Sequence, residues 1–552
     1  MLAAGCGSAQ SSPAVPAAKG AELVLVGGHV MTGDPARGSD QADATAIAVR
    51  DDRIVYVGDD AGARAMAGSA TRVVELHGRG VTAGLVDTHA HLYGLGAARE
   101  MLDLNDQDSP DRAVAMVAKA VAGRAAGEWI TGRGWDQNRW ADKEFPHHRL
   151  LDAVAPQHPV SLRRVDGHAL WANAAAMREA GVSKATADPP GGRIVRDADG
   201  QPTGVFVDNA MGLIEAHIPA PAADVIERRI RTAAAEAIAN GLTGVDEMGI
   251  GKETIAAYRR LAAAGQLPLR VYAFVAGGSE TAATIAQHAP PELHPAPDAM
   301  FVLRGVKLYA DGALGSRGAA LLAPYSDAPE LTGNWVLSPA ELRAATAVSV
   351  EAGWQVATHA IGDAANRAVL DAYEASGAGP EARLRVEHAQ VLAPADIPRF
   401  AKLGVIASMQ PTHATSDMPW AEARLGPERI RGAYAWRSIL DTGAHLAAGS
   451  DFPVEKVSPI LGLYAATTRQ DARGEPSGGW YPDQRMTLAE AVTAFTREAA
   501  YASFAEDRRG IIRTGFQADL TVYDRKLSSG APLLDTRVDM TIVGGRVVYE
   551  RK

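Results

Sequence analysis

The sequence predicts an α/β protein built on a TIM (β/α)8 barrel, with a small β-sandwich formed from both termini and a β-rich insertion after the first barrel strand. Three observations lead to this prediction. In the middle of the chain, eight apolar strand-like runs alternate with alanine-rich helical stretches. At both ends, short strand-like runs are separated by turn residues. The length of 552 residues exceeds one ordinary domain but fits a barrel that carries additions.

The first twenty residues form a tail that contains Cys6. Cys6 is the single cysteine of the chain, which excludes an intramolecular disulfide and a cysteine-based zinc cluster. Residues 2–8 resemble the end of a bacterial lipoprotein signal, in which the cysteine is lipidated after cleavage. Two alternatives follow. Either a signal remnant tethers a periplasmic or membrane-anchored lipoprotein whose start lies upstream, or residues 1–20 are a disordered tail of a cytoplasmic protein.

Residues 21–80 and 510–552 are predicted to form the β-sandwich domain together. Turn residues such as Gly27-Gly28 separate the N-terminal runs, and the C-terminal runs have the same style. The predicted strands are residues 22–26, 46–49, 53–57, 72–76, 518–523 and 540–549.

Residues 81–509 are predicted to form the barrel. The interval 94–240 is too long for one crossover helix, so it is predicted to be an insertion, with strand-like pieces at 159–164 and 192–206. Eight parallel strands close a TIM barrel. The eight predicted strands are residues 81–91, 242–248, 270–275, 302–309, 354–359, 384–388, 405–409 and 445–450.

The composition narrows the class of partner. The formal charge is −10 and the pI is about 5.9, without a long basic run, so the chain offers no electrostatic footprint for nucleic acid. No stretch reaches the roughly 20 apolar residues that span a bilayer. Membrane contact is therefore expected only through a lipid anchor at Cys6. The expected partner is a small-molecule substrate, and a barrel of this size also suits a homodimer.

Histidines and an aspartate stand where predicted barrel strands end. His89 and His91 lie two residues apart at the end of the first strand, so both rings point to the same face. His359, His388 and Asp451 end or follow the fifth, sixth and eighth strands. Barrel active sites form at the carboxyl ends of the strands, and imidazoles with a carboxylate suit zinc or another divalent transition ion. The sequence therefore predicts a metal site.

The motifs around these residues resemble the amidohydrolase superfamily, in its amidohydrolase-3 branch, which includes N-substituted formamide deformylases. The resemblance covers the chain from about residue 21 to the C-terminus. The matching stretches are residues 132–136 (GRGWD), 166–173 (DGHALWAN), 305–312 (GVKLYADG), 358–363 (THAIGD), 385–390 (RVEHAQ), 410–413 (QPTH) and 449–454 (GSDFPV).

The resemblance implies a centre of two divalent ions bridged by a carboxylated Lys307. Zinc is the first expectation, and manganese, iron, nickel and cobalt suit the same ligands. An unmodified Lys307 that pairs with Asp311 or binds substrate is the alternative. The implied metal ligands are His89 and His91 for the buried ion, His359 and His388 for the more exposed ion, and Lys307 and Asp451.

The function implied is hydrolysis of a carbon–nitrogen bond, of the amide or N-acyl type, by a metal-bridged hydroxide. Asp451 would take the proton of the attacking water and deliver it to the leaving nitrogen. The same centre could cleave an ester, a lactone or a phosphotriester. A non-catalytic, ligand-binding lipoprotein on an inherited barrel is the rival from another class.

Further residues are predicted to shape the pocket. His168 would hydrogen-bond the substrate carbonyl or its oxyanion, or else fix the loop around residue 171. Two of the predicted substrate contacts have a structural alternative: Trp135 could pack within the insertion, and Arg317 could cap a neighbouring helix. The predicted substrate contacts are Trp135, Asp136, Arg317 and His413.

Overall fold

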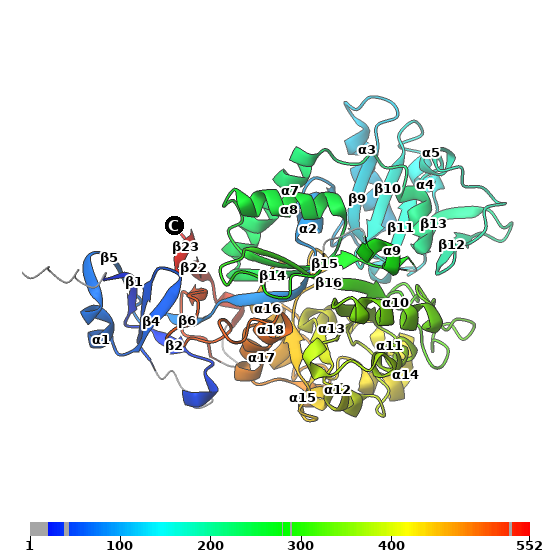
Figure 1. Ribbon diagram of the computed structural model, residues 1–552. Coiled ribbons are helices and arrows are strands. Elements are labelled where there is room, and N and C mark those ends of the chain that lie inside the picture. The colour runs from blue at the N-terminus through cyan, green and yellow to red at the C-terminus, as the bar shows by residue number, and fades with distance from the viewer. Residues whose placement is uncertain (1–19, 38–43, 279, 287–289, 529–532) are drawn as a thin grey trace, which may run out of the picture.

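The computed structural model describes residues 20–37, 44–278, 280–286, 290–528 and 533–552 (Figure 1). Cys6, and with it the predicted lipidation site, lies outside the described residues. Within the described part of the chain, no helix has both the length and the apolar character needed to cross a bilayer.

Eight parallel strands form the barrel, and they follow one another in chain order around it. The first and last strands are joined where the amide of Asp451 donates to the carbonyl of His89 at 2.7 Å. Each of the eight predicted runs contains one barrel strand, although the first run also contributes a strand to another sheet. Their bounds are β7 (Leu85–Ala90), β14 (Leu242–Ile250), β15 (Arg270–Ala276), β16 (Phe301–Tyr309), β17 (Gln355–Ala360), β18 (Arg385–His388), β19 (Ile406–Met409) and β20 (Leu446–Ala448).

Helices surround the barrel because each turns an apolar face toward the strands. In α7 (Ala223–Ala239), Ile226, Ile230 and Ala237 recur at helical spacing and are buried. A capping box between Ser338 and Glu341 starts α10 (Pro339–Glu351). The other helices between barrel strands include α8 (Lys252–Ala263), α9 (Thr281–Ala286), α11 (Asp363–Ser376), α12 (Ile397–Leu403), α13 (Pro411–Asp417), α14 (Ala421–Arg429) and α15 (Trp436–Leu440), and α16 (Pro459–Thr468), α17 (Leu488–Ala494) and α18 (Arg497–Ala502) follow β20.

The predicted first strand, residues 81–91, is divided between two sheets. β6 (Gly80–Ala83) belongs to a terminal sheet, whereas β7 begins the barrel after Gly84. A Cβ at Gly84 would lie 2.3 Å from Thr243 Oγ1, so this close approach requires glycine. The division was missed because the run is apolar on both sides of Gly84, and periodicity does not record a change of sheet.

Both chain termini contribute to two further sheets, which lie at one end of the molecule (Figure 1). Their facing side chains form one buried cluster that includes Leu25, Ile47, Val522 and Ile542. This packing creates the predicted sandwich of N-terminal and C-terminal strands. One sheet has the order β4 (Arg53–Gly58), β3 (Ala46–Arg50), β1 (Ala21–Val26), β5 (Ala67–Glu75), and the other β2 (His29–Met31), β6, β21 (Leu520–Tyr523), β22 (Val538–Val543), β23 (Arg546–Glu550).

The segment between β7 and α7 carries a six-stranded sheet of its own, on the opposite side of the barrel from the terminal sheets (Figure 1). Helices α3 (Pro110–Val121), α4 (Arg149–Asp152) and α5 (Ala174–Glu179) accompany it. The insertion is therefore β-rich, as predicted. Its strand order is β12 (Gly192–Arg196), β13 (Pro202–Asp208), β11 (Ala169–Ala172), β10 (Val160–Arg164), β9 (Ile130–Trp135), β8 (Leu102–Asp103).

Candidate metal centre

The carboxyl ends of four barrel strands bring the predicted ligands together. β7 supplies His89 and the adjoining His91, β17 supplies His359, β18 supplies His388, and Asp451 follows β20. His388 and Asp451 have positive φ angles of 73° and 60°, a backbone conformation that costs energy for residues other than glycine. Such strain accumulates where a side chain must be aimed precisely, which fits two residues at strand ends.

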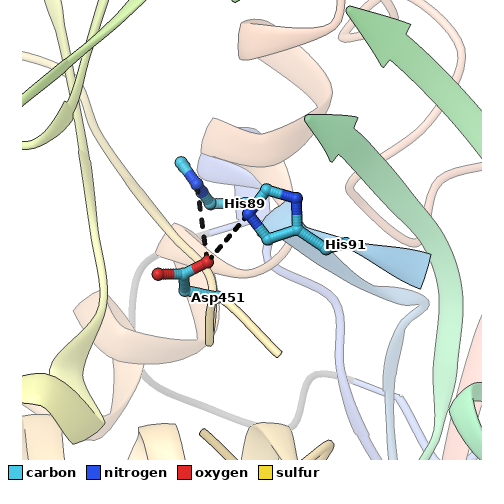
Figure 2. A group of neighbouring side chains, drawn as sticks. All are labelled: His89, His91 and Asp451. Atoms are coloured by element: carbon cyan, nitrogen blue, oxygen red, sulfur yellow. Dashed lines mark ion pairs between the residues drawn. The ribbon is translucent and has the colours of Figure 1, made fainter. Parts of the chain in front are cut away.

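His89, His91 and Asp451 form a group in which three potential ligand atoms converge (Figure 2). Asp451 Oδ1 lies 3.2 Å from His91 Nε2 and 3.7 Å from His89 Nε2. This oxygen is buried and accepts no hydrogen bond from the described residues. Burying a carboxylate oxygen without a donor costs free energy, and a bound cation would remove this cost. The group is therefore suited to bind a cation.

The hydrogen bonds of three histidines fix which ring nitrogen is free. Nδ1 of His91 lies 3.0 Å from the carbonyl of Met248, which can only accept, so Nδ1 carries the proton. Nδ1 of His89 lies 2.5 Å from Glu387 Oε2, and Nδ1 of His388 lies 2.8 Å from Gln410 Oε1. Each Nε2 then presents a lone pair, which is how histidine is held when it binds a metal. This donor set fits a divalent ion.

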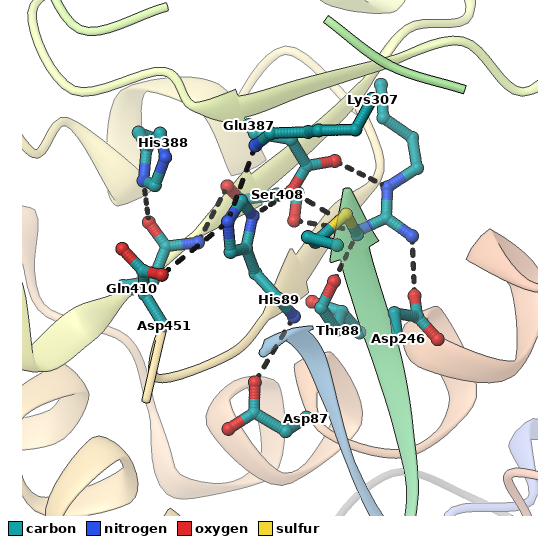
Figure 3. Close-up of polar contacts among 12 residues, drawn as sticks. Asp87, Thr88, His89, Asp246, Lys307, Glu387, His388, Ser408, Gln410 and Asp451 are labelled. Carbon is teal, nitrogen blue, oxygen red and sulfur yellow. Dashed lines mark hydrogen bonds and ion pairs between the residues drawn. The ribbon is translucent and has the colours of Figure 1, made fainter. Parts of the chain in front are cut away.

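Glu387 belongs to a buried ionic network beside His89 (Figure 3). Arg385 donates from Nε to Glu387 Oε1 at 2.7 Å and forms an ion pair with Asp246 at 2.5 Å. Burial acts to raise the pKa of Glu387, but Arg385 and His89 hold it below its ordinary value. Glu387 therefore stays ionised and keeps the Nδ1 proton on His89. Sequence reasoning missed this role of Glu387 and Arg385, for which the only signal was two charged residues within a buried strand.

Lys307, on β16, is buried beside His89 without an acidic partner among the described residues. Its Nζ lies 3.4 Å from His89 Nε2, and burial lowers its pKa to about 8. The alternative ion pair with Asp311 does not form. Asp311 instead accepts hydrogen bonds from the amides of Ala320, Ile361 and Gly362.

His359 and His168 face each other across the barrel mouth, with ring centroids 4.9 Å apart. His359 Nε2 lies 3.5 Å from Asp311 Oδ1, which leaves Nδ1 as its candidate ligand atom. His168 Nδ1 lies 2.9 Å from Asp208 Oδ1. Burial lowers the pKa of His168, but the hydrogen bond to Asp208 together with the negative charges of Asp208, Asp166 and Asp311 raises it overall. The raised pKa favours the protonated form of His168, in which Nδ1 donates to Asp208 and Nε2 can donate toward the centre.

His413, near the start of α13, joins a second group of converging ligand atoms with His388 and Asp451. Its Nε2 lies 3.7 Å from Asp451 Oδ2 and has no hydrogen-bond partner among the described residues. The two oxygens of Asp451 thus face different histidines. His413 is available either to substrate or to a metal ion.

A cavity of about 1010 Å³ opens above these residues, between the barrel and the insertion. Asp136, His168 and His413 line it, in agreement with their predicted positions. Asp136 is held by an ion pair with Arg164. The cavity also exposes residues that the sequence reasoning did not single out, among them Arg133 and Trp420.

Two predicted substrate contacts lie elsewhere. Trp135 is fully buried in the core of the insertion, stacked on Trp140, and its Nε1 donates to the carbonyl of Leu162 at 2.7 Å. Arg317 pairs with Asp327 at 3.1 Å and does not line the cavity. These two predictions need correction. The pairing of β9 with β10 is irregular between Arg133 and Trp135, where Gly134 has φ of 115°, and Trp135 packs into the core of the insertion instead of following Arg133 to the cavity. A carboxylate holds Arg317.

Comparisons with known proteins agree with the resemblance that the sequence motifs indicated. A model of the amidohydrolase family matches residues 72–549. The chain is 32% identical over 551 residues to the protein LONG AFTER FAR-RED 3 of Arabidopsis thaliana, covering 97% of this chain and 92% of that protein. It is 28% identical over 556 residues to N-substituted formamide deformylase of Arthrobacter pascens, covering 96% and 98%. An uncharacterised metal-dependent hydrolase of Pyrococcus horikoshii OT3 has a similar structure, with a TM-score of 0.73 and 26% identity, covering 91% and 97%.

Proposed function

The chain belongs to the amidohydrolase family, and from this premise we propose that it hydrolyses a carbon–nitrogen bond in an amide or N-acyl substrate, using bound divalent metal. One observation carries the proposal. The Nε2 lone pairs of His89 and His91 converge on an unpartnered oxygen of Asp451 inside a large cavity. A relative of similar length is named N-substituted formamide deformylase, which supports a C–N bond as the target.

The proposed centre would hold two divalent ions, zinc in the first instance, and Lys307, once carboxylated, would serve as a ligand to them. His89 and His91 would hold one ion, and His359 and His388 the other. Bound divalent ions polarise a carbonyl and lower the pKa of water, so the chain needs no serine or cysteine nucleophile. The lowered pKa of Lys307 supports its carboxylation, because only an unprotonated amine reacts with carbon dioxide.

The side chains around the centre then have distinct tasks. Asp451 accepts the proton of the attacking water and passes it to the leaving nitrogen. In its protonated form, His168 donates a hydrogen bond from Nε2 to the substrate carbonyl, and the bond is strengthened as negative charge develops on that oxygen. Asp208 holds the ring of His168 in the orientation that this requires.

The proposal is tested by Asp451→Asn in protein purified without chelators. Loss of a general base lowers the rate by about 10² to 10⁴. We expect at least about a 10²-fold loss of kcat/KM on N-acyl substrates, with the unfolding midpoint retained. The matched control is Asp441→Asn, which removes an exposed carboxylate that does not line the cavity.

The substrates are amide and ester pairs that share one acyl group. If the protein cleaves the ester but not the matching amide, an ester hydrolase would replace the C–N assignment. Protein that binds no metal after reconstitution, or an Asp451→Asn variant of full activity, would reject the mechanism.

A further inference from the structure

Arg133 lies on β9, in the insertion, and lines the same cavity as His168, His388 and Asp451. It is mostly buried, and burial, assisted by Arg163, lowers its pKa to about 10. The guanidinium is therefore still positively charged at neutral pH. A buried charge is normally paired, since an isolated one is costly to remove from water.

No carboxylate within ion-pair distance is available to Arg133 among the described residues. Three carboxylates act on it from farther away: two of them are paired with other arginines, and the third, Asp451, belongs to the candidate metal centre. The two pairs are Asp166 with Arg164 and Glu215 with Arg163.

The other arginines of the cavity show that Arg133 differs from them. Each of them forms an ion pair within the described residues. Arg133 alone in this set has none, so its missing partner is not a general feature of the cavity wall. The pairs are Arg99 with Glu236, Arg139 with Asp106, Arg164 with Asp136, and Arg473 with Asp471.

The hydrogen bonds of Arg133 are also incomplete. Nη2 donates to the carbonyl of Val165 at 2.9 Å, which fixes the guanidinium, while the buried Nε has no acceptor. A guanidinium has five N–H donors in a planar fork that matches a carboxylate. The guanidinium of Arg133 is therefore held in place and still has N–H donors available for a ligand.

The loop from Val165 to His168 links Arg133 to the metal centre. Gly167 has φ of 80°, and a Cβ there would lie 3.5 Å from Arg133 Nη2, so the loop passes close to the guanidinium. His168, the next residue, faces His359 at the barrel mouth. A ligand bound to Arg133 would consequently extend toward the groups that hold the scissile carbonyl.

We propose that Arg133 is a carboxylate-binding subsite, and that the substrates are N-acyl compounds with a carboxylate close to the acylated nitrogen, such as N-acylated amino acids. The assignment of the acyl group rests on the proposed function, whereas the anion subsite does not require turnover. The carboxylate would supply the negative charge that the protein does not place beside Arg133.

The experiment measures binding with analogues that resist hydrolysis. Metal-loaded protein is titrated by calorimetry with N-methanesulfonyl alanine and N-methanesulfonyl phenylalanine, in both enantiomers, and with their primary carboxamides. The members of each pair have nearly the same shape, and only one of them carries a negative charge. We expect at least one carboxylate to bind about tenfold or more tightly than its carboxamide, the effect of a hydrogen bond to a charged group.

Variants assign that preference to Arg133. Arg133→Gln should abolish it, and Arg133→Lys should retain only part of it, because lysine keeps the charge but not the fork. Arg139→Gln, a paired arginine of the same cavity, should leave it unchanged. Arg133→Lys still decides the question if Arg133→Gln fails to fold.

The proposal is overturned if no carboxylate analogue is preferred, or if the preference survives in both Arg133 variants. Retained carboxylate preference in a protein that cleaves no amide would reject the proposed function and leave the subsite standing. The two hypotheses therefore fail separately.

Discussion

At the scale of single residues, the candidate metal centre depends on what lies behind each histidine. His89, His91 and His388 all have Nδ1 next to an acceptor, and this decides that Nε2 faces the centre. Glu387 is the one charged acceptor among the three. Because Arg385 keeps Glu387 ionised, a residue that touches no substrate controls the protonation of a predicted ligand.

Glu387→Gln tests this control. The variant removes the negative charge behind His89, so metal affinity should fall about 10- to 100-fold. The measurement is competition with a chelator, with thermal unfolding as a check on the fold. Glu490→Gln is the control, since Glu490 pairs with Arg437 away from the centre. Equal affinity for wild type and Glu387→Gln would show that the glutamate does not orient His89.

Lys307→Ala tests the carboxylated bridge. The substitution removes the proposed bridging group, so both metal content and activity should be lost. A short carboxylate such as acetate or propionate would fill the space and restore part of each. Elemental analysis of the purified variant measures the metal, and Lys402→Ala serves as an exposed control. Full metal content without added carboxylate would exclude the bridge.

At the scale of elements, the position of His91 depends on the helix that follows it. α2 (Leu92–Ala98) begins directly after His91 and packs on α7. A Cβ at Gly96 would lie 2.1 Å from the carbonyl oxygen of Arg229 in α7. The obstacle is backbone, which does not move aside as a side chain does, so this glycine allows the two helices to approach.

Gly96→Ala should therefore destabilise the protein. Overpacking of this kind costs about 1–3 kcal/mol, which denaturant unfolding would detect as a lower midpoint. Gly212→Ala is the matched control, because no heavy atom lies within 4 Å of its added Cβ. A midpoint unchanged by Gly96→Ala would mean that α2 shifts freely on α7.

At the scale of the whole molecule, a buried ion pair joins the barrel to the terminal sheets. Arg270 opens β15, and Asp519 immediately precedes β21. Arg270 Nε donates to Asp519 Oδ2 at 2.7 Å, and both side chains are nearly inaccessible to solvent. Burial acts to raise the pKa of Asp519, but Arg270 lowers it below its ordinary value.

Asp519→Asn should destabilise the protein by about 3–5 kcal/mol at neutral pH, because it leaves Arg270 buried without its counter-charge. Since folding lowers the pKa of Asp519, its contribution is present above the unfolded value of about 3.9 and is lost as the pH falls through the folded value. The difference in the free energy of unfolding between wild type and variant should therefore become smaller at acidic pH. Urea unfolding across a pH series measures this, with the exposed Asp483→Asn as control. A difference that does not change with pH would contradict the assignment.

The sequence by itself determined the eight-stranded barrel and the ends of the strands at which His89, His359, His388 and Asp451 stand. These features follow from local pattern, because apolar runs of strand length and the residue that ends each run are both readable along the chain. The resemblance of the motifs to the amidohydrolase superfamily was likewise carried by short contiguous stretches.

Only the tertiary structure decided which side chains meet. Trp135 and Arg133 are two residues apart on β9, yet one packs into the insertion and the other lines the cavity. Glu387 reaches His89 across 298 positions of sequence. Asp311 accepts hydrogen bonds from backbone amides and does not pair with Lys307. Such outcomes depend on which distant segments pack together, and neither hydrophobic period nor motif spacing contains that information.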